Sequence, residues 1–480
     1  MDYPALIPFI SYFILVILIG LLTAKYSSRG ISEFFIGDRK MHPFVVALSA
    51  VVSGRSAWLL LGFTGQSYTM GLSAIWAVAG YIVVEFFLFI YYAPRLKKFA
   101  DKYNCITIPD FFAARFGDKN GSLRILITTI FIIFMITYVA AQFVGGGKAF
   151  FAYFGMQYST GLVLTASLVL IYTLLGGFLA VSYTDVLQAI VMLIALVALP
   201  IIGIMNKGGF SETFSGLSSM NPAYFNPVAF GMGSLISFLG IGLGSPGNPH
   251  ILVRYMSIKD HRQLKYSAVV GTTWNILLAA GAFMIGIVAR IYFPEVQMLP
   301  GQDPENAFVS LASEVLSPAL VGIILAAVIA SIMSTADSQL LVAASSVVRD
   351  FYEKYLNKDR DIPQEKLTLL SRVVVALLVY IAVILGFIVE DMVFWFVLFA
   401  WAGLGAAIGP ASIQALFRKK TTKSGVMAGM VTGTLTVFIW KSNPSLNSKI
   451  YELIPAFLIA WLITHLVSSL EHYLKNRSNH

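Results

Sequence analysis

Long apolar stretches dominate this sequence and limit the structures that it can form. About thirteen stretches come close to or exceed the roughly 20 apolar residues that a helix needs to cross a bilayer. They lie at residues 4–24, 43–70, 74–93, 125–150, 160–177, 186–206, 228–248, 268–292, 311–345, 370–389, 392–416, 425–440 and 452–471. Only 12% of the residues are charged, against roughly 25% in a soluble domain. The sequence therefore predicts an all-α polytopic membrane protein with about 13 transmembrane helices.

Basic residues are divided unevenly between the two sides of the membrane. With thirteen spans, 27 of the 33 Lys and Arg residues fall in one set of alternate connections, and the opposite set holds only Lys207, Arg290, Lys441 and Lys449. Lys and Arg collect on the cytoplasmic side of membranes. We therefore expect a multi-pass protein of the cytoplasmic (inner) membrane, with its N-terminus outside and its C-terminus in the cytoplasm. The net charge of +9 then reflects topology and is no sign of nucleic-acid binding.

Two of the spans are interrupted by residues that break helices. Ser53 and Gly54 fall near the middle of span 43–70, and Gly240–Pro249 in the seventh span contains four glycines and two prolines. Unwound backbone inside a membrane is tolerated only where protein buries it or where it lines a cavity. Such a pair of breaks, one in each half of the chain, indicates an inverted-repeat secondary transporter that binds its solute between them. Alternatively, the glycines only allow helices to pack closely.

On this interpretation, spans 2–6 and 7–11 form a five-plus-five inverted repeat. No connection is long enough for a folded domain outside the membrane, so residues 1–480 are expected to form a single transmembrane transporter domain. Its core covers about residues 43–416, and the peripheral spans are 4–24, 425–440 and 452–471. The expected partners are a small-molecule solute and the lipid bilayer, with no nucleic acid and no obligate protein partner.

Three hydroxyl side chains share one face of the span at 311–345. Ser331, Ser334 and Thr335 are spaced i, i+3 and i+4. Neutral hydroxyls joined by free carbonyls of a broken helix suit a hard monovalent cation such as Na⁺, and Asp337 lies close by in the sequence. The alternative is that each hydroxyl bonds back to a carbonyl one turn earlier, which is common in membrane helices.

Several motifs point to a known family. They are Thr107–Phe112 with Arg115–Lys119, Gly176–Asp185 (GGFLAVSYTD) followed by Gln188, Gly247–Leu252, Met333–Thr335 with Ser338–Leu341, and Ala400–Pro410. Together they resemble the sodium:solute symporter family, and most of all its proline-transporting members. The resemblance implies a LeuT-like five-plus-five core and 13 spans. It also implies uptake of proline or a similar small amino acid by alternating access, coupled to Na⁺.

The same resemblance assigns ion-binding residues. It places Na⁺ on the carbonyls of Val52 and Arg55 and on the side chains of Ser334 and Thr335, and Ser331 stands where the family pattern has alanine. With Asp337, these residues form the predicted ion site.

The resemblance also assigns an ion path and a solute site. Asp185 would assist passage of the cation to the cytoplasm, although Asp185 and Thr184 suit a cap of the sixth span equally well. The implied solute-binding residues are Ser56, Trp58, Tyr138, Ser245, Asn248, Pro249 and Trp401.

The second span departs from the proline-transporting pattern at two positions. Gly54 replaces an acid, and Arg55 stands next to it. A guanidinium near the bilayer centre costs roughly 2.5–3.5 kcal/mol on insertion scales, so Arg55 needs a partner, either Glu85 or Asp337. Arg55 either forms a structural ion pair, replaces the coupling cation, or faces an anionic group of the solute. Asp337 is alternatively the substitute for the acid missing at Gly54, which would preserve sodium coupling.

The seventh-span break also departs from that pattern. Ile241 and Ser245 replace two large aromatic residues, and Pro246 and Asn248 replace a Phe and a Gln. These changes reshape the predicted cavity and weaken the inference of proline. The alternative function is therefore sodium-independent or proton-coupled transport of a different small zwitterion or carboxylate, with Arg55 in place of the cation.

No catalytic constellation is present in the sequence. The six histidines include no pair with metal-ligand spacing, Cys105 has no evident base partner, and Gly145–Lys148 lacks the spacing of a phosphate-binding loop. We predict that the chain is not an enzyme and that it needs no cofactor besides the suspected coupling ion Na⁺. A transporter-like solute sensor, which would need an output domain, and a channel, which would need rings of polar groups, are less well supported.

Overall fold

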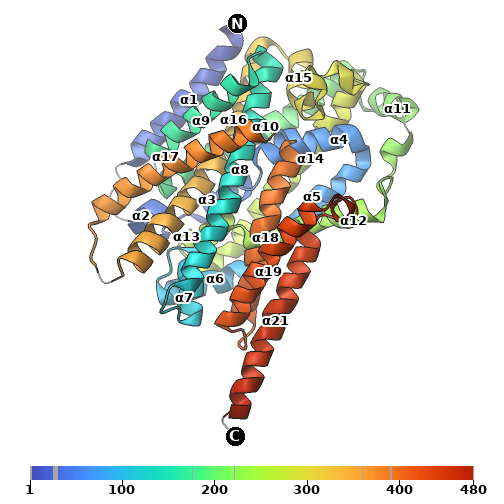
Figure 1. The fold of residues 1–480 in the computed structure, drawn as a ribbon. Helices are drawn as coiled ribbons and strands as arrows, with labels where there is room; N and C mark the ends of the chain where they lie inside the picture. Colours follow the sequence, from blue (N-terminus) through green and yellow to red (C-terminus); the bar gives the residue numbers. More distant parts are fainter. Residues whose placement is uncertain are drawn as a thin grey trace.

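The fold is an almost entirely helical bundle (Figure 1). The computed structural model describes residues 3–24, 31–175, 177–220, 222–358, 360–389 and 392–478, so Gly176 of the GGFLAVSYTD motif lies outside the described residues. The main helices are α1 (Tyr3–Ala24), α3 (Pro43–Val52), α4 (Thr64–Met70), α5 (Ile75–Phe87), α8 (Ser122–Phe154), α9 (Tyr158–Leu175), α10 (Phe178–Asn206), α12 (Gly231–Gly240), α13 (Pro249–Ser257), α14 (Leu264–Tyr292), α16 (Pro318–Ser345), α17 (Gln364–Ile388), α18 (Val393–Phe417), α19 (Lys423–Ser442) and α21 (Leu453–Ser478). Shorter helices are α2 (Ile31–Ile36), α6 (Ala93–Tyr103), α7 (Ile108–Phe116), α11 (Phe210–Met220), α15 (Ala307–Val315) and α20 (Pro444–Asn447).

All thirteen predicted stretches coincide with helices, but their lengths are uneven. Within the described ranges, nine helices are long and apolar enough to cross a membrane. Four predicted stretches are not counted separately. The second and third are joined in the continuous segment Trp58–Tyr103, and the fifth, Tyr158–Leu174, is short. The seventh is broken, and the twelfth, α19, contains several glycines and threonines that lower its hydropathy. The predicted all-α polytopic fold is confirmed.

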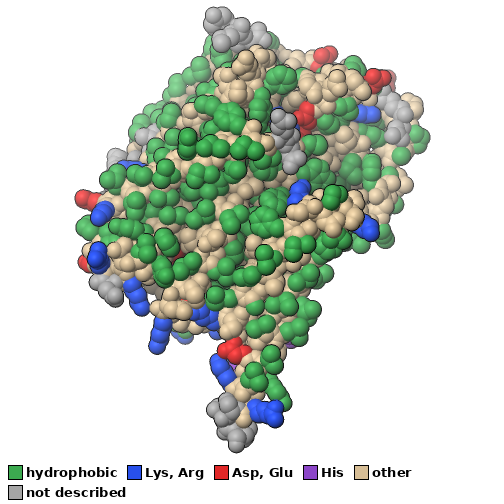
Figure 2. All heavy atoms as spheres, viewed as in Figure 1, with side chains coloured by type: hydrophobic (Ala, Val, Ile, Leu, Met, Phe, Trp, Pro, Cys, Tyr) green, Lys and Arg blue, Asp and Glu red, His purple; other side chains and the backbone are tan. Residues whose placement is uncertain are grey.

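The arrangement of the chain ends fits an odd number of crossings. Helix α1 begins at one end of the molecule and α21 finishes at the opposite end (Figure 1). The band between the ends is largely hydrophobic, and Lys and Arg side chains gather toward the end where α21 finishes (Figure 2).

Helix packing repeats between the two halves of the chain. Helix α3 lies against α10 and α14, and η6 (Ile241–Gly247), at the corresponding place in the second half, lies against α18 and α5. Likewise α10 packs on α16, and α18 packs on α8. These reciprocal contacts agree with the predicted five-plus-five repeat. Helix α18 and the segment Pro318–Leu356 are the most enclosed spans, with 89% and 83% of their apolar windows buried, against 33% for α1. The middle of the bundle is therefore bounded by α16 and α18.

Both predicted interruptions are present. Helix α3 ends at Val52, and a tight turn over residues 53–55 precedes renewed helical winding and the π-helix Trp58–Phe63. Helix α12 passes into the 3₁₀ segment η6, and an extended Asn248 then precedes α13. Each half of the molecule thus contributes one discontinuous span.

The glycines of the seventh span also permit close packing. A Cβ on Gly244 would lie 2.0 Å from Nε1 of Trp401, and a Cβ on Gly247 would lie 2.3 Å from the carbonyl oxygen of Leu404. These glycines therefore serve both purposes considered above: they interrupt the seventh span, and they let the interrupted segment pack closely on α18.

Substitution of Gly247 by Ala should destabilise the fold. The new methyl group must push the α18 backbone away, and overpacking of this kind costs about 1–3 kcal/mol. We expect a lower thermal unfolding midpoint for the solubilised protein. Gly216→Ala on α11 is the matched control, because within the described part of the chain no atom outside its own helix turn lies within 4 Å of its new Cβ, and it should be neutral or slightly stabilising. Identical midpoints for both variants would contradict the packing described here.

Candidate functional site

A small cavity lies between the two breaks. Its volume is only about 10 Å³, roughly the room for one water molecule and far below the roughly 300 Å³ at which ligand pockets usually begin. Its lining comes from both interrupted spans and from α5, α8 and α18. The lining residues are Gly54, Arg55, Trp58, Tyr81, Tyr138, Ile241, Val397, Leu398 and Trp401. Three of the predicted solute-binding residues, Trp58, Tyr138 and Trp401, therefore share one cavity with Arg55.

Aromatic rings form much of the cavity wall. The Trp58 ring stacks on Phe394, with 5.4 Å between centroids. The ring of Tyr138 meets Trp401 edge to face at 6.4 Å. The Trp401 indole N–H donates to the carbonyl of Ile241 at 2.8 Å, so this side chain provides a hydrogen bond to a backbone carbonyl of the interrupted seventh span. The wall offers flat apolar surface to a small ring or aliphatic side chain.

The charge of Arg55 is fully partnered inside the protein. Its Nη2 atom pairs with Glu85 of α5, and its Nε donates to Oδ1 of Asn275 at 2.8 Å. The guanidinium also lies 3.7 Å from the centre of the Tyr81 ring. Arg55 is 1% exposed and Glu85 is 3% exposed, so the pair is removed from water. Of the two candidate partners, Arg55 pairs with Glu85 and not with Asp337.

Glu85 connects this ion pair to the second break. Its Oε1 atom accepts a hydrogen bond from Ser245 Oγ at 3.3 Å, and its Oε2 accepts one from Asn275 Nδ2 at 2.8 Å. A buried carboxylate with three different donors is held in one position. Both discontinuous spans are thereby linked through a single acid on α5.

The other predicted solute residues surround the cavity without lining it. Ser56 Oγ accepts from the amide of Trp58 at 3.1 Å. Asn248 Nδ2 donates to the carbonyl of Gly244 at 2.9 Å, and its buried Oδ1 has no partner among the residues that the structure describes. Pro249 occupies the first turn of α13. These residues support the backbone of the breaks.

Sequence reasoning missed Tyr81, Val397 and Leu398 on the cavity wall and Asn275 behind Arg55. Asn275 had a usable signal, because a polar side chain in the middle of an apolar span marks a functional or structural site. The two aliphatic residues carry no such signal, since nothing distinguishes them from other apolar residues of α18.

The predicted ion-binding residues meet where α16 passes the end of α3. Ser334 Oγ lies 3.3 Å from the carbonyl oxygen of Val52. The buried Thr335 Oγ1 has no hydrogen-bond partner within the described residues. Ser331 bonds back to the carbonyl of Val328 at 2.7 Å and Ser334 to the carbonyl of Ser331 at 3.1 Å, so the alternative of back-bonding holds for both serines but not for Thr335. The geometry offers several neutral oxygens and one unsatisfied hydroxyl.

Asp337 and Asp185 belong to a buried network that adjoins the ion-binding residues, because Ser338 Oγ lies 2.7 Å from the carbonyl oxygen of Ser334. Asp185 Oδ2 accepts from Arg254 Nη2 at 3.0 Å, and Arg254 Nε donates to Ser49 Oγ at 2.6 Å. Arg254 also bonds to Ser338, whose hydroxyl donates to Asp337 Oδ1 at 3.1 Å. This network ties together α3, α10, α13 and α16.

Two expectations about this network need correction. Asp185 cannot cap its helix together with Thr184, because α10 begins at Phe178 and both residues lie inside it. Arg254, which the charge pattern assigns to a cytoplasmic connection, is only 1% exposed. The carboxylate of Asp185 holds it in the interior.

A helical bundle with two discontinuous spans and a small cavity between them, lined by aromatic rings and a buried arginine, has the architecture of a secondary active transporter. The family model of the sodium:solute symporter family matches residues 34–433. Sodium/proline symporters of Staphylococcus aureus, for example those of strains JH9 and NCTC 8325, are 36% identical over 468 residues. This match covers 96% of the chain and 91% of each relative.

Two solved structures share the fold. A Na⁺-coupled sialic acid symporter in a substrate-bound outward-open state aligns with a TM-score of 0.84 at 18% identity, over 98% of both chains. A nucleobase-cation-symport-1 family transporter in a closed conformation aligns with a TM-score of 0.56 at 14% identity, over 92% of this chain and 96% of the other. These structures establish the LeuT-like fold.

This chain belongs to the sodium:solute symporter family. It is a multi-pass membrane transporter for cation-coupled solute uptake and not an enzyme, because the family and the similar proteins are symporters.

Breaking the Arg55–Glu85 pair should cost more stability than removing it whole. A buried charge left without its partner costs about 3–5 kcal/mol, whereas apolar replacement of both partners is often nearly neutral. We expect Glu85→Gln and Arg55→Met each to lower the unfolding midpoint strongly, and the double variant to recover most of the loss. Thermal unfolding in a double-mutant cycle measures this coupling. Additive losses in the double variant would show that the two charges do not depend on each other.

Proposed function

We propose that this protein is a Na⁺-coupled symporter that imports proline, or a similar small amino acid, by alternating access. The observation that carries the proposal is the unsatisfied, buried hydroxyl of Thr335 beside Ser334 and the end of α3. The similarity to sodium/proline symporters over nearly the whole chain supports proline as the solute.

The donor set at α16 suits Na⁺. Ser334 Oγ, Thr335 Oγ1 and the carbonyls of Val52 and Arg55 would provide neutral oxygen ligands, as hard cations prefer. A monovalent ion needs only partial charge compensation, so the absence of an acid at Gly54 does not exclude it. Arg55 does not compete for this role, because its charge is neutralised by Glu85.

The side chains around the cavity suit a small zwitterion with a compact side chain. The cavity itself has a volume of only about 10 Å³, so a solute can bind there only when the lining side chains move apart. Trp58, Tyr138 and Trp401 would contact an apolar ring or side chain. Donors of Arg55 not used by Glu85 and Asn275 would attract a carboxylate.

Serine at position 245 and isoleucine at position 241 favour a second candidate function. They leave the second break without the large aromatic residues of the proline-transporting pattern, and the arginine is an internal cation close to the cavity. Sodium-independent or proton-coupled transport of another small zwitterion or carboxylate is this alternative.

We further propose that the N-terminus lies outside the cell and the C-terminus in the cytoplasm. The end of the molecule where α21 finishes carries the concentration of Lys and Arg (Figure 2), as the positive-inside rule requires of the cytoplasmic side.

Substitution of Thr335 by Val should lower the affinity for Na⁺ without unfolding the protein. The change removes one oxygen ligand and keeps the shape of the side chain. We expect uptake of labelled proline in proteoliposomes to require about tenfold more Na⁺ for half-maximal rate, equivalent to roughly 1.4 kcal/mol. The matched control is Thr137→Val on the exposed face of α8, where the hydroxyl bonds only to its own helix, and it should behave as the wild type.

Replacement of Na⁺ by choline, first at fixed pH and then with a proton gradient, separates the two candidate functions. Saturable proline uptake lost without Na⁺ supports the main proposal. Uptake that persists without Na⁺ and follows the proton gradient would reject sodium coupling. Failure to transport proline under any condition would reject proline as the solute.

A further inference from the structure

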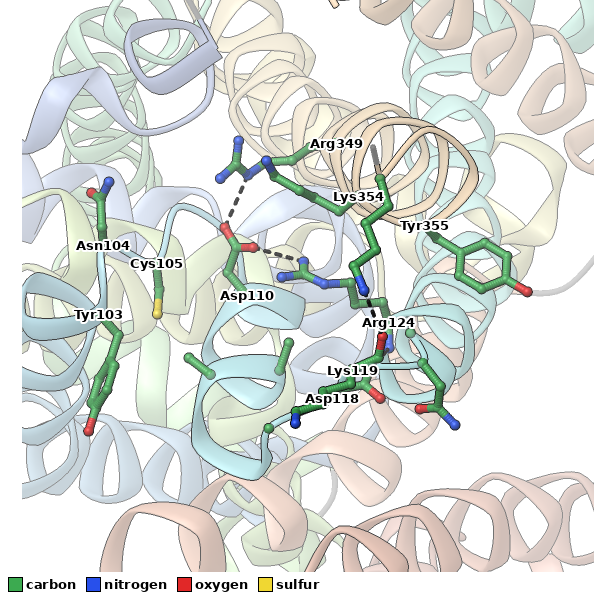
Figure 3. A pocket seen from close by; sticks show the side chains of 16 residues that line it. Tyr103, Asn104, Cys105, Asp110, Asp118, Lys119, Arg124, Arg349, Lys354 and Tyr355 are labelled. Atoms are coloured by element: carbon green, nitrogen blue, oxygen red, sulfur yellow. Dashed lines mark hydrogen bonds and ion pairs between the residues drawn. The ribbon is translucent and has the colours of Figure 1, made fainter. Parts of the chain in front are cut away.

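A second and larger cavity lies at the basic end of the bundle (Figure 3). Its volume of about 650 Å³ falls in the range of small-molecule sites. It opens between the connection from α6 to α8 and the π-helix η11 (Ser346–Leu356), which continues α16. It shares no lining residue with the cavity between the breaks.

The floor of this pocket is a fixed network of charges. Asp110 of α7 pairs with Arg124 at 2.8 Å and with Arg349 at 3.0 Å, as Figure 3 shows. Arg124 also contacts Asp350. Burial raises the pKa of Asp110, but the two guanidinium groups and a backbone N–H outweigh burial and lower it to about 2. Asp110 is therefore ionised at neutral pH and holds both arginines in place.

The rim of the pocket carries an excess of positive charge. It includes Lys119, Lys354 and Lys358, all exposed. Lys354 pairs with Glu353 at 2.8 Å. Lys358 donates to the backbone carbonyl of Lys119 at 3.3 Å, and among the described residues neither Lys119 nor Lys358 has a carboxylate partner. The nearest acid on the rim, Asp118, is already paired with Lys423 at 2.6 Å.

Apolar side chains flank this basic rim. Tyr103 and Tyr355 line the pocket and are 49% and 39% exposed, and the adjacent Leu356 is 56% exposed. Tyr residues at the ends of spans typically lie at the level of lipid headgroups. Basic pockets between membrane helices on the cytoplasmic side suit anionic headgroups. A soluble anion would gain nothing from the apolar flank, whereas a phospholipid would use both parts.

We propose that this pocket binds the phosphate headgroup of an anionic phospholipid, with Lys119, Lys354 and Lys358 as the contacting side chains. Its acyl chains would lie against the exposed side chains of Tyr355 and Leu356. Lys119 lies just before α8 and Lys354 lies in η11, so a lipid that contacts both would bridge the start of α8 to the end of the helix that carries Ser334 and Thr335.

The test is native mass spectrometry of the full-length protein with phosphatidylglycerol or phosphatidylcholine, together with its thermal unfolding. One lysine near an anionic surface contributes roughly fivefold to binding, so the triple variant Lys119→Gln, Lys354→Gln, Lys358→Gln should bind phosphatidylglycerol roughly 100-fold more weakly. It should also lose the stabilisation that this lipid gives. Lys259→Gln, Arg262→Gln, Lys265→Gln removes the same charge at exposed positions outside the pocket and should bind like the wild type.

Two controls complete the test: a charge-preserving variant and inorganic phosphate in place of the lipid. The triple Lys→Arg variant at positions 119, 354 and 358 should retain the lipid, which distinguishes lost charge from lost folding. Inorganic phosphate alone should not stabilise the wild type in phosphatidylcholine. Equal binding of both lipids, equal loss in both Gln variants, loss in the Arg variant, or full stabilisation by inorganic phosphate would overturn the proposal. None of these readouts depends on transport, so they stand apart from the test of proline uptake.

Discussion

Unpaired backbone inside a membrane must be covered by protein, and this requirement places the functional centre of the molecule. At the first break, the amide of Ala57 donates to Gln142 of α8 at 2.9 Å. At the second, Trp401 of α18 and Asn248 satisfy carbonyls of η6. The helices that satisfy the breaks are therefore also the walls of the cavity, so the fold and the site depend on the same contacts.

The buried arginine changes the electrostatics of this centre without adding net charge. Arg55 and Glu85 form a neutral pair whose surroundings, Asn275, Tyr81 and Ser245, use most of its hydrogen-bonding capacity. The hydroxyl of Thr335 on α16 has no partner among the described residues, and the arginine is held away from it by Glu85 of α5 and Asn275 of α14.

Much of this architecture could be predicted from sequence, because apolar length and Gly/Pro interruptions are local signals. The thirteen stretches and both breaks depend on residues close together in the chain. Local signals could not show that Arg55 pairs with Glu85 and not with Asp337. That choice depends on which faces of α5 and α16 point toward Arg55 in the folded bundle. The burial of Arg254 could not be predicted either, because its partner Asp185 is 69 residues away in the sequence and only the folded structure brings them together.

The proposed coupling requires that a solute bound between the two breaks and Na⁺ bound at Thr335 beside the first break stabilise each other. Equilibrium binding of labelled proline to the purified protein over a range of Na⁺ concentrations tests this directly. The account predicts that the Kd for proline falls as Na⁺ rises, and that proline raises the affinity for Na⁺ by the same factor. A Kd for proline that is the same in Na⁺ and in choline would contradict it.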